Sequence, residues 1–125
     1  MKADTPEQVI QLFASALGRG DVDGAMALYD PEAVLAPRPG GQVIGLEAIR
    51  AALEQFVALK PRLTGEITKV LTANGVALVM NRWRLTGTQP DGMPVELSGH
   101  SADVVRRDGD GGWRILIDDP WGGGS

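Results

Sequence analysis

The sequence predicts an α+β domain in which three helices pack on one face of a mainly antiparallel sheet. Apolar residues recur at helical spacing in the first half of the chain, and from residue 62 onward they alternate with polar residues. Short turns rich in glycine, asparagine and aspartate divide the second half, and strands joined by such turns must run antiparallel. Helices followed by a run of antiparallel strands are typical of an α+β domain.

Three segments of the first half carry helix signals. The first follows Thr5, which can cap a helix, and a proline that fits the first helical turn. The second starts at Asp21 and is expected to stop at Asp30-Pro31. The third covers residues 46–59, where apolar residues form a stripe along one helix face.

The strands are expected in two groups. Residues 32–45 are rich in proline and glycine and are expected to form short strands around a mobile loop at 37–41. The pair Asn74-Gly75 favours a tight hairpin between two of the longer strands. These longer strands are expected over residues 62–71, 76–88, 95–107 and 113–118.

The length and charge of the chain limit its organisation and partners. With 125 residues it is long enough for one domain that folds alone. We expect this domain to cover residues 1–121 and the glycine-rich residues 122–125 to form a flexible tail. A net charge of −4 lacks the basic excess of a nucleic-acid-binding face, so no nucleic acid partner is expected.

The residue types exclude several kinds of site. Without cysteine the chain offers no thiolate nucleophile and no disulfide, and its single histidine, His100, cannot build a two-histidine metal site. No metal or cofactor is therefore expected. No apolar run approaches the roughly 20 residues of a membrane span, and the N-terminus lacks the apolar core of a secretory signal. We therefore expect a cytoplasmic protein that does not bind membranes.

Three segments of the chain resemble the nuclear transport factor 2-like superfamily, which includes ketosteroid isomerases and SnoaL-like polyketide cyclases. The opening TPEQVIQLFASALGRGDVDGAMALYDPEAV resembles the first two helices of this family, and GLEAIRAALEQF resembles its third. The ending RRDGDGGWRILIDDPWG resembles the final hairpin of uncharacterised bacterial members. The resemblance implies a strongly curved sheet that closes with the helices into a cone (a cystatin-like roll) around an apolar pocket. It also implies a homodimer through the convex sheet face.

The resemblance to ketosteroid isomerases can be followed residue by residue. These enzymes use a carboxylate base after the first strand, together with a tyrosine and a protonated aspartic acid that donate hydrogen bonds to the developing oxyanion. Aligned on the turn between the first two helices, the base falls at Ala36-Pro37 and the tyrosine at Phe13. Counting back from the last hairpin places the aspartic acid at Asp103. With no base to remove an α-proton, ketosteroid isomerisation is not expected.

Epoxide hydrolases of the same superfamily surround a water with an Asp–Arg–Asp arrangement. Asp103 and a carboxylate of the last strand could supply the acids, but Ser101 stands where the resemblance requires the strand arginine. Arg82 and Arg84 would face outward if Trp83 faces the pocket, because neighbouring strand residues point to opposite faces. Hydrolase chemistry of this type is an alternative that depends on another positive group.

Asp103 is the main candidate for a pocket acid. It shares its strand parity with Leu97, Gly99 and Ser101, which are apolar or small and indicate the concave face of the sheet. No lysine or arginine lies on this parity before Arg107. A carboxyl removed from water without a partner has a raised pKa, because its charged form loses most. A carboxylate bonded to a neighbouring strand is the structural alternative.

The end of the last strand offers two more carboxylates. Strict alternation places Ile115, Ile117 and Asp119 on one face and Asp118 on the other, so Asp119 is expected to join Asp103 as a catalytic candidate. Which of these aspartates faces the pocket cannot be decided from alternation alone, and Asp119 could instead cap the strand end at the rim.

The predicted ligand pocket combines aromatic, small and polar residues. It is expected to be lined by Phe13, Tyr29, Asn81, Trp83, Ser101, Asp103, Ile117 and Trp121. His100 has the opposite parity to Asp103 and is expected at the surface or in an interface. Val76, Leu78 and Met80 lie on the outward face, and such an exposed apolar patch predicts a homodimer through the convex side.

The sequence therefore predicts a small-molecule pocket protein of the SnoaL-like or ketosteroid isomerase-like type. It would be an isomerase, cyclase or hydrolase that acts on an apolar substrate without metal. The alternatives are a non-catalytic ligand-binding domain and a protein–protein interaction domain. Two buried carboxyls near a water in the pocket would favour an enzyme, a dry apolar pocket would favour a binder, and a solidly packed interior would favour an interaction domain.

Overall fold

A computed structural model describes residues 3–123 of the chain. Three helices precede or interrupt the strands: α1 (Pro6–Gly18), α2 (Val22–Met26) and α3 (Leu46–Val57). The strands are β1 (Tyr29–Leu35), β2 (Val43–Ile44), β3 (Arg62–Ala73), β4 (Val76–Thr88), β5 (Pro94–Arg107) and β6 (Trp113–Asp118). Among these residues no helix is long and apolar enough to cross a membrane.

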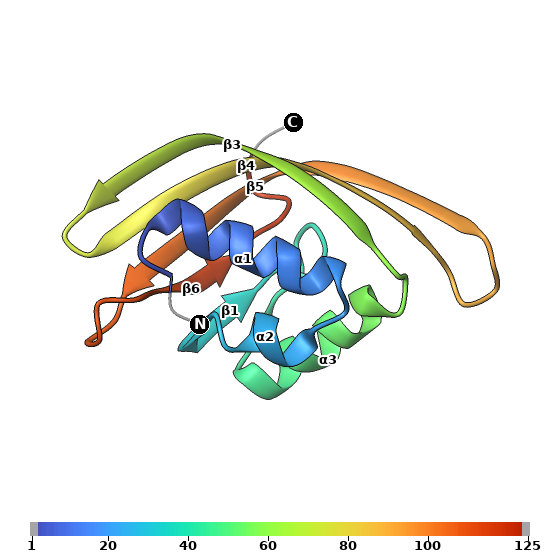
Figure 1. Cartoon of the computed structure of the whole chain (residues 1–125), viewed down its shortest axis with the longest axis horizontal. Coiled ribbons are helices and arrows are strands. Elements are labelled where there is room, and N and C mark those ends of the chain that lie inside the picture. The colour runs from blue at the N-terminus through green and yellow to red at the C-terminus, as the bar shows by residue number, and fades with distance from the viewer. Residues whose placement is uncertain (1–2, 124–125) are drawn as a thin grey trace.

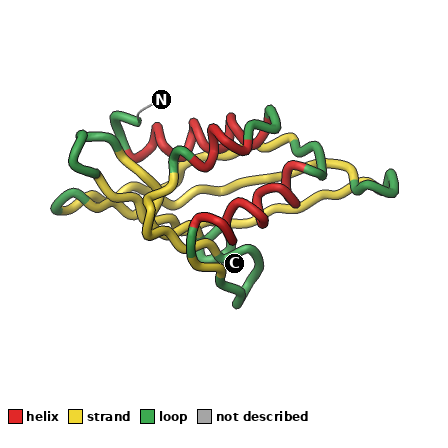
Figure 2. Tube along the Cα trace, turned by 90° about the horizontal axis from the view of Figure 1, so that it is seen from below, coloured by secondary structure: helices red, strands yellow, loops and turns green. Residues whose placement is uncertain are grey.

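One strongly curved sheet organises the molecule. Its strand order is β2-β1-β6-β5-β4-β3, and every neighbouring pair is antiparallel except β1 and β6, which run parallel. The three long strands β3, β4 and β5 arch over the helices, so that α1, α2 and α3 all lie on the concave side (Figure 1). Seen from below, α1 and α3 lie across this face of the long strands (Figure 2). The predicted α+β class is confirmed.

The buried core lies between the helices and the inner face of the sheet. Thr5 caps α1 by accepting a hydrogen bond from the backbone N–H of Gln8, as the sequence predicts. Val9 on α1, Ile49 and Leu53 on α3, and Val79 on β4 belong to one buried apolar cluster. The helical stripes and the strand alternation therefore meet in one apolar layer.

The end of the second predicted helix was wrong. Asp21 caps α2, but the helix ends at Met26, and Tyr29 already pairs with Ile115 of β6 as the first residue of β1. Burial of Tyr29 and pairing with the last strand override the helical pattern of this segment. Pro31 is accommodated inside β1 because the β1–β6 register is irregular there.

Part of the expected glycine-rich tail is held against the sheet. The backbone N–H of Gly123 donates a 2.8 Å hydrogen bond to the carbonyl of His100 on β5, and Gly122 lies in the turn that follows Asp119. The flexibility of the tail stays a prediction for these two residues. The rest of the predicted tail, residues 124–125, lies outside the described residues, as do residues 1–2 of the predicted domain.

Candidate functional site

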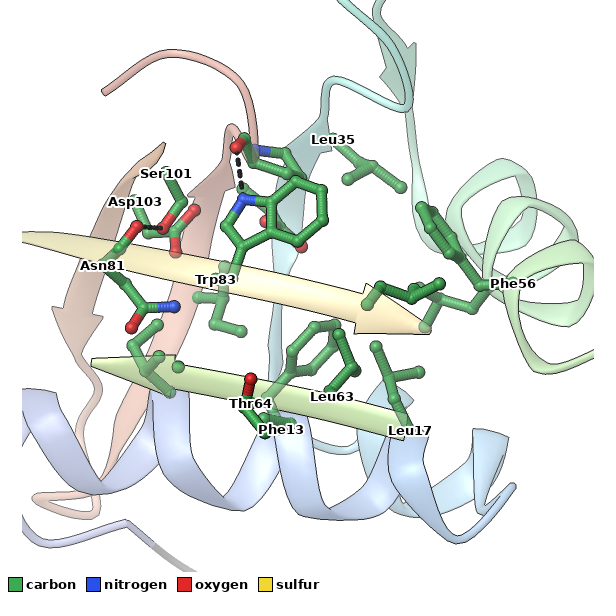
Figure 3. A pocket seen from close by; sticks show the side chains of 18 residues that line it. Phe13, Leu17, Leu35, Phe56, Leu63, Thr64, Asn81, Trp83, Ser101 and Asp103 are labelled. Atoms are coloured by element: carbon green, nitrogen blue, oxygen red, sulfur yellow. Dashed lines mark hydrogen bonds between the residues drawn. The ribbon is translucent and has the colours of Figure 1, made fainter. Parts of the chain in front are cut away.

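A cavity of about 110 Å³ lies between α1, α3 and the concave face of the sheet. Its lining is mostly aliphatic and aromatic. Figure 3 shows Asn81, Ser101 and Asp103 at one end of the cavity, Leu35 and Phe56 at the other, and Trp83 between them. The cavity therefore has one polar end in an otherwise apolar enclosure, which is the common form of a small-molecule site.

Asp103 supplies the first carboxyl of the polar end. It lies on β5, where alternation directs it inward, and its side chain is only 5% exposed. Its Oδ1 accepts a 2.9 Å hydrogen bond from the backbone N–H of Asp119. Burial, followed by the negative charge of Asp118 and a hydrogen bond to it, raises the pKa of Asp103 well above its ordinary value.

Asp118 supplies the second carboxyl. It ends β6, lines the cavity, and is 6% exposed. Its Oδ2 accepts a 2.6 Å hydrogen bond from the hydroxyl of Tyr29 on β1. Burial raises the pKa of Asp118, whereas the hydrogen bonds from Tyr29 and Asp103 oppose this shift. Burial and the adjacent Asp118 charge raise the pKa of Tyr29 well above its ordinary value, so the phenol stays protonated.

The environment of the two carboxyls favours one proton on the pair rather than none. Like charges in contact in a buried site cannot both be ionised, and the hydrogen bond between the carboxyls favours the neutral form of Asp103 and the charged form of Asp118. Asp118 then accepts hydrogen bonds from both Tyr29 and Asp103. The arrangement therefore favours the protonated form of Asp103 at the cavity wall.

The expectation that Asp119 joins Asp103 was wrong, because β6 contains a β-bulge. Val105 pairs with Ile115, but its neighbour Val104 pairs with Ile117, so one extra residue is inserted in β6. The bulge reverses the alternation beyond it. Ile117 is consequently 42% exposed on the convex side, and Asp118 rather than Asp119 faces the cavity.

Of the other predicted lining residues, Phe13, Asn81, Trp83 and Ser101 border the cavity and Tyr29 and Trp121 do not. Tyr29 lies behind Asp118, and its ring packs edge-on against Phe13 with centroids 5.4 Å apart. Trp121 packs edge-on against Trp83, with ring centroids 5.1 Å apart. The two residues support the lining from outside.

Sequence reasoning missed several lining residues. Those that it did not single out are apolar side chains from α1, α3 and the strands, among them Ile10, Leu17, Leu35, Leu53 and Phe56. The helical stripes predicted burial of the residues on α1 and α3, and nothing in a stripe distinguishes a residue that lines a cavity from one that fills the core. Asp118 was recognised as a carboxylate, but the bulge that turns it inward has no signal in the sequence.

Comparison with known proteins identifies the family. The family model of the SnoaL-like domain matches residues 9–115. The chain belongs to the SnoaL-like domain family. The SnoaL-like part of the resemblance is thereby confirmed. No curated protein matches the sequence significantly.

Solved structures share the fold of this SnoaL-like domain at low sequence identity. A protein of Thiobacillus denitrificans, proposed to be a calcium/calmodulin-dependent protein kinase type II association domain, superposes with a TM-score of 0.79 at 19% identity over 95% of each chain. A ketosteroid isomerase-like protein of Erwinia carotovora atroseptica gives 0.78 at 20% identity over 90% of this chain and 88% of that chain. A proposed dehydratase of Streptomyces avermitilis gives 0.77 at 16% over 89% of each.

The SnoaL-like domain departs from the isomerase pattern at the positions that the sequence indicated. Phe13 lines the cavity where the resemblance places a tyrosine, and neither Ala36 nor Pro37 is part of the lining. Within residues 3–123, no three histidine, cysteine, aspartate or glutamate side chains are grouped so that they could hold a metal ion. The polar side chains that line the cavity are those of the two aspartates, Ser101, Asn81, Thr64 and Trp83.

Proposed function

We propose that this SnoaL-like domain is a small-molecule enzyme in which neutral Asp103 donates a hydrogen bond to an oxygen atom of an apolar substrate. The supporting observation is the buried Asp103–Asp118 pair at the wall of an apolar cavity. A donor in such a site stabilises negative charge that develops on a carbonyl or leaving-group oxygen. This role suits isomerase, cyclase or hydrolase chemistry.

Asp103, and not Asp118, is assigned this role because of the hydrogen bonds at each group. Asp118 accepts from Tyr29 and from Asp103, so its charge is already satisfied by protein donors. Asp103 holds the shared proton and can redirect its O–H from Asp118 to a substrate oxygen, while Asp118 keeps the hydrogen bond from Tyr29. Full transfer of this proton to the substrate would leave two adjacent buried carboxylates, which is unfavourable. Asp103 is therefore expected to donate a hydrogen bond and to keep its proton.

The size of the cavity limits the part of the substrate that it encloses. An engineered apolar cavity of about 150 Å³ accommodates benzene. The cavity of about 110 Å³ therefore suits a group of roughly six non-hydrogen atoms or fewer. A larger substrate must keep the rest of its structure outside this enclosure.

Binding of cyclopentanone and methylcyclopentane tests the proposal, because these probes have similar shape and only the ketone carries an oxygen. The indole N–H resonance of Trp83 reports occupancy, since this group lies at the cavity and donates a 2.7 Å hydrogen bond to the carbonyl of Pro120. A hydrogen bond to the ketone is expected to give it roughly fivefold higher affinity than an equally well-fitting hydrocarbon.

Two variants of Asp103 provide the matched comparison. Asp103→Asn retains an N–H donor and is expected to retain the preference for the ketone. Asp103→Leu removes the donor and is expected to abolish it. Thermal unfolding of each variant shows whether the fold is retained. An unchanged preference in a folded Asp103→Leu protein would contradict the role of Asp103 and favour a non-catalytic ligand-binding domain.

A further inference from the structure

We propose that the groove between α1 and the edge strand β3 binds the carboxylate of an amphipathic substrate, with Lys60 as its principal contact and Arg62 as a second. The apolar end of the same molecule would occupy the cavity. This inference names a substrate class for the proposed function. It rests on that function only because it places the apolar end of the substrate in the cavity.

The groove and the cavity are continuous. The groove has a volume of about 850 Å³ and shares with the cavity a set of lining residues: Ile10, Ala14, Leu63, Gly65 and Asn81. Gly65 is central to the junction, because a Cβ atom added there would lie 2.9 Å from the side-chain oxygen of Asn81. The missing side chain leaves room for the Asn81 amide at the boundary between the two spaces.

Asn81 presents an available polar group at this junction. Its backbone carbonyl accepts from the hydroxyl of Ser101, but in the described part of the chain its side-chain amide has no hydrogen-bond partner. A partly exposed amide without a partner in the protein loses little free energy, because it can form hydrogen bonds to water or to a polar group of a ligand. The junction can therefore admit a molecule with both apolar and polar segments.

The charge of the groove is opposite to that of the molecule. The chain has 16 acidic and 12 basic residues, yet the residues that line the groove include Lys60 and Arg62 and no acid. Most other arginines are paired with carboxylates, such as Arg82 with Glu66 and Arg106 with Asp30. Lys60 and Arg62 have no such partner among residues 3–123. A cleft lined by one sign of charge attracts the opposite charge.

The backbone holds Lys60 at the mouth of the groove. Lys60 follows α3 with a φ angle of 52°, in the left-handed region that favours glycine. The next residue, Pro61, is buried and fixes the turn. Arg62 pairs with Thr86, so its side chain starts on the convex side and must pass the free edge of β3 to reach the groove. Lys60 is therefore the nearer cation.

The neighbouring helix favours a carboxylate over a phosphate monoester. Groove-lining residues Ser15 and Gly18 belong to the C-terminal end of α1, where the helix dipole is negative. This field opposes a dianion more strongly than a monoanion. A single carboxylate is attracted by Lys60 and Arg62 and is repelled less by the helix dipole than a dianion would be.

Octanoate and octanamide test the proposal, because they share a hydrocarbon chain and differ in charge. Affinities are measured at pH 7 from the indole N–H resonance of Trp83. We expect octanoate to bind roughly tenfold more tightly than octanamide. The preference should decrease with added salt, because exposed charges are screened. In Lys60→Gln/Arg62→Gln it should disappear while octanamide affinity stays within about twofold.

A matched variant controls for net charge. Lys69→Gln/Arg84→Gln removes the same two charges from exposed residues of β3 and β4 outside the groove, and it should retain the preference for octanoate. Equal binding of both probes, no binding of either, or a preference that survives the loss of Lys60 and Arg62 would overturn the proposal. The measurement does not involve Asp103, so the proposed acid role can fail with the anion preference intact.

Discussion

Strand alternation predicted the position of only one of the two buried carboxyls. The apolar and small neighbours of Asp103 on β5 predicted its inward direction, which its burial confirms. They also predicted a raised pKa, a direction that burial and the charge of Asp118 favour. Its partner Asp118 was placed on the wrong face, because alternation has no signal for the inserted residue in β6. The same pattern therefore placed Asp103 correctly but predicted Asp119 at the cavity in place of Asp118.

The raised pKa of Asp103 makes stability depend on pH in a defined direction. The folded protein keeps a proton that the unfolded chain releases above its ordinary pKa of about 3.9, so this stabilising contribution is complete below that pH. The contribution is lost as the pH rises through the pKa of the folded state. Asp103→Asn cannot titrate at this position. We therefore expect the stability of the wild type relative to this variant to fall as pH rises above about 4.

Urea unfolding of both proteins between acidic and neutral pH measures this difference. Asp108 has a pKa lowered to about 2 and gives the opposite slope at acidic pH, but it is present in both proteins and cancels. Carbon NMR titration of the Asp103 carboxyl provides the independent reading. A midpoint at or below about 3.9 would remove Asp103 from the site.

Tyr29 is expected to stabilise the charged form of Asp118. Tyr29→Phe removes one of the hydrogen bonds that Asp118 accepts while preserving the ring that packs on Phe13. Loss of a donor to a buried charged group should cost about 1–3 kcal/mol and raise the pKa of Asp118 further. Unfolding measurements and carboxyl NMR test the two effects, and a variant that changes neither would show that this hydrogen bond is weak.

At the scale of elements, local signals were reliable where no distant partner competed. Thr5 starts α1, and β4 and β6 have the predicted bounds. The signals failed between Leu28 and Pro31, where a helical pattern was converted to a strand by pairing with β6 from the far end of the chain. Such a partner cannot be identified from the segment itself.

Gly87 permits close packing between β4 and the end of α3. A Cβ atom at this position would lie 2.6 Å from the backbone carbonyl oxygen of Leu59, which accepts a 2.7 Å hydrogen bond from the N–H of Thr88. Gly87→Ala should therefore destabilise the protein by about 1–3 kcal/mol. Urea unfolding measures the loss, and wild-type stability in this variant would contradict the close approach.

Gly18 provides the opposite case. It lies in α1, and a Cβ atom there would meet nothing within 4 Å. Gly18→Ala should stabilise the protein by about 0.5–1 kcal/mol, because alanine loses less backbone entropy on folding. The two glycine variants together separate a glycine that packing requires from one that it does not. A loss of stability in Gly18→Ala would show an unrecognised constraint at the end of α1.

For the whole molecule, we expect no measurable ketosteroid isomerisation. The resemblance places the base at Ala36-Pro37, which carries no carboxylate, and Phe13 replaces the second oxyanion donor. A fused four-ring steroid also exceeds an enclosure of about 110 Å³. Each missing donor typically costs about a hundredfold or more in rate. Turnover of a steroid enone clearly above the buffer rate would show that the alignment is wrong.

The convex face carries a continuous apolar row that predicts a homodimer. Paired residues on all six strands form the row, in sheet order Ile44, Val34, Ile117, Val104, Leu78 and Leu71. Ile44 is 70% and Leu71 57% exposed. A two-fold axis on this face would place the row against its own copy.

Sedimentation velocity tests the predicted dimer at tens of micromolar protein. Leu78→Lys and Ile117→Lys should shift the protein to a monomer of 13.2 kDa. Met93→Lys, at the exposed turn between β4 and β5, is the matched control and should leave the assembly unchanged. A monomeric wild type would remove the prediction.

The position of β6 in the sheet has a consequence for synthesis of the chain. It is the last of the six strands in chain order, yet it lies between β1 and β5 and joins the first two strands to the other three. Until Trp113–Asp118 is available, the nascent chain holds two sheet fragments whose facing edges have no partner. Sheet completion must therefore follow translation of all six strands, and long-range closure of this kind is slow. The free edges of β1 and β5 are accordingly the points at which the unfinished protein is most exposed to aggregation.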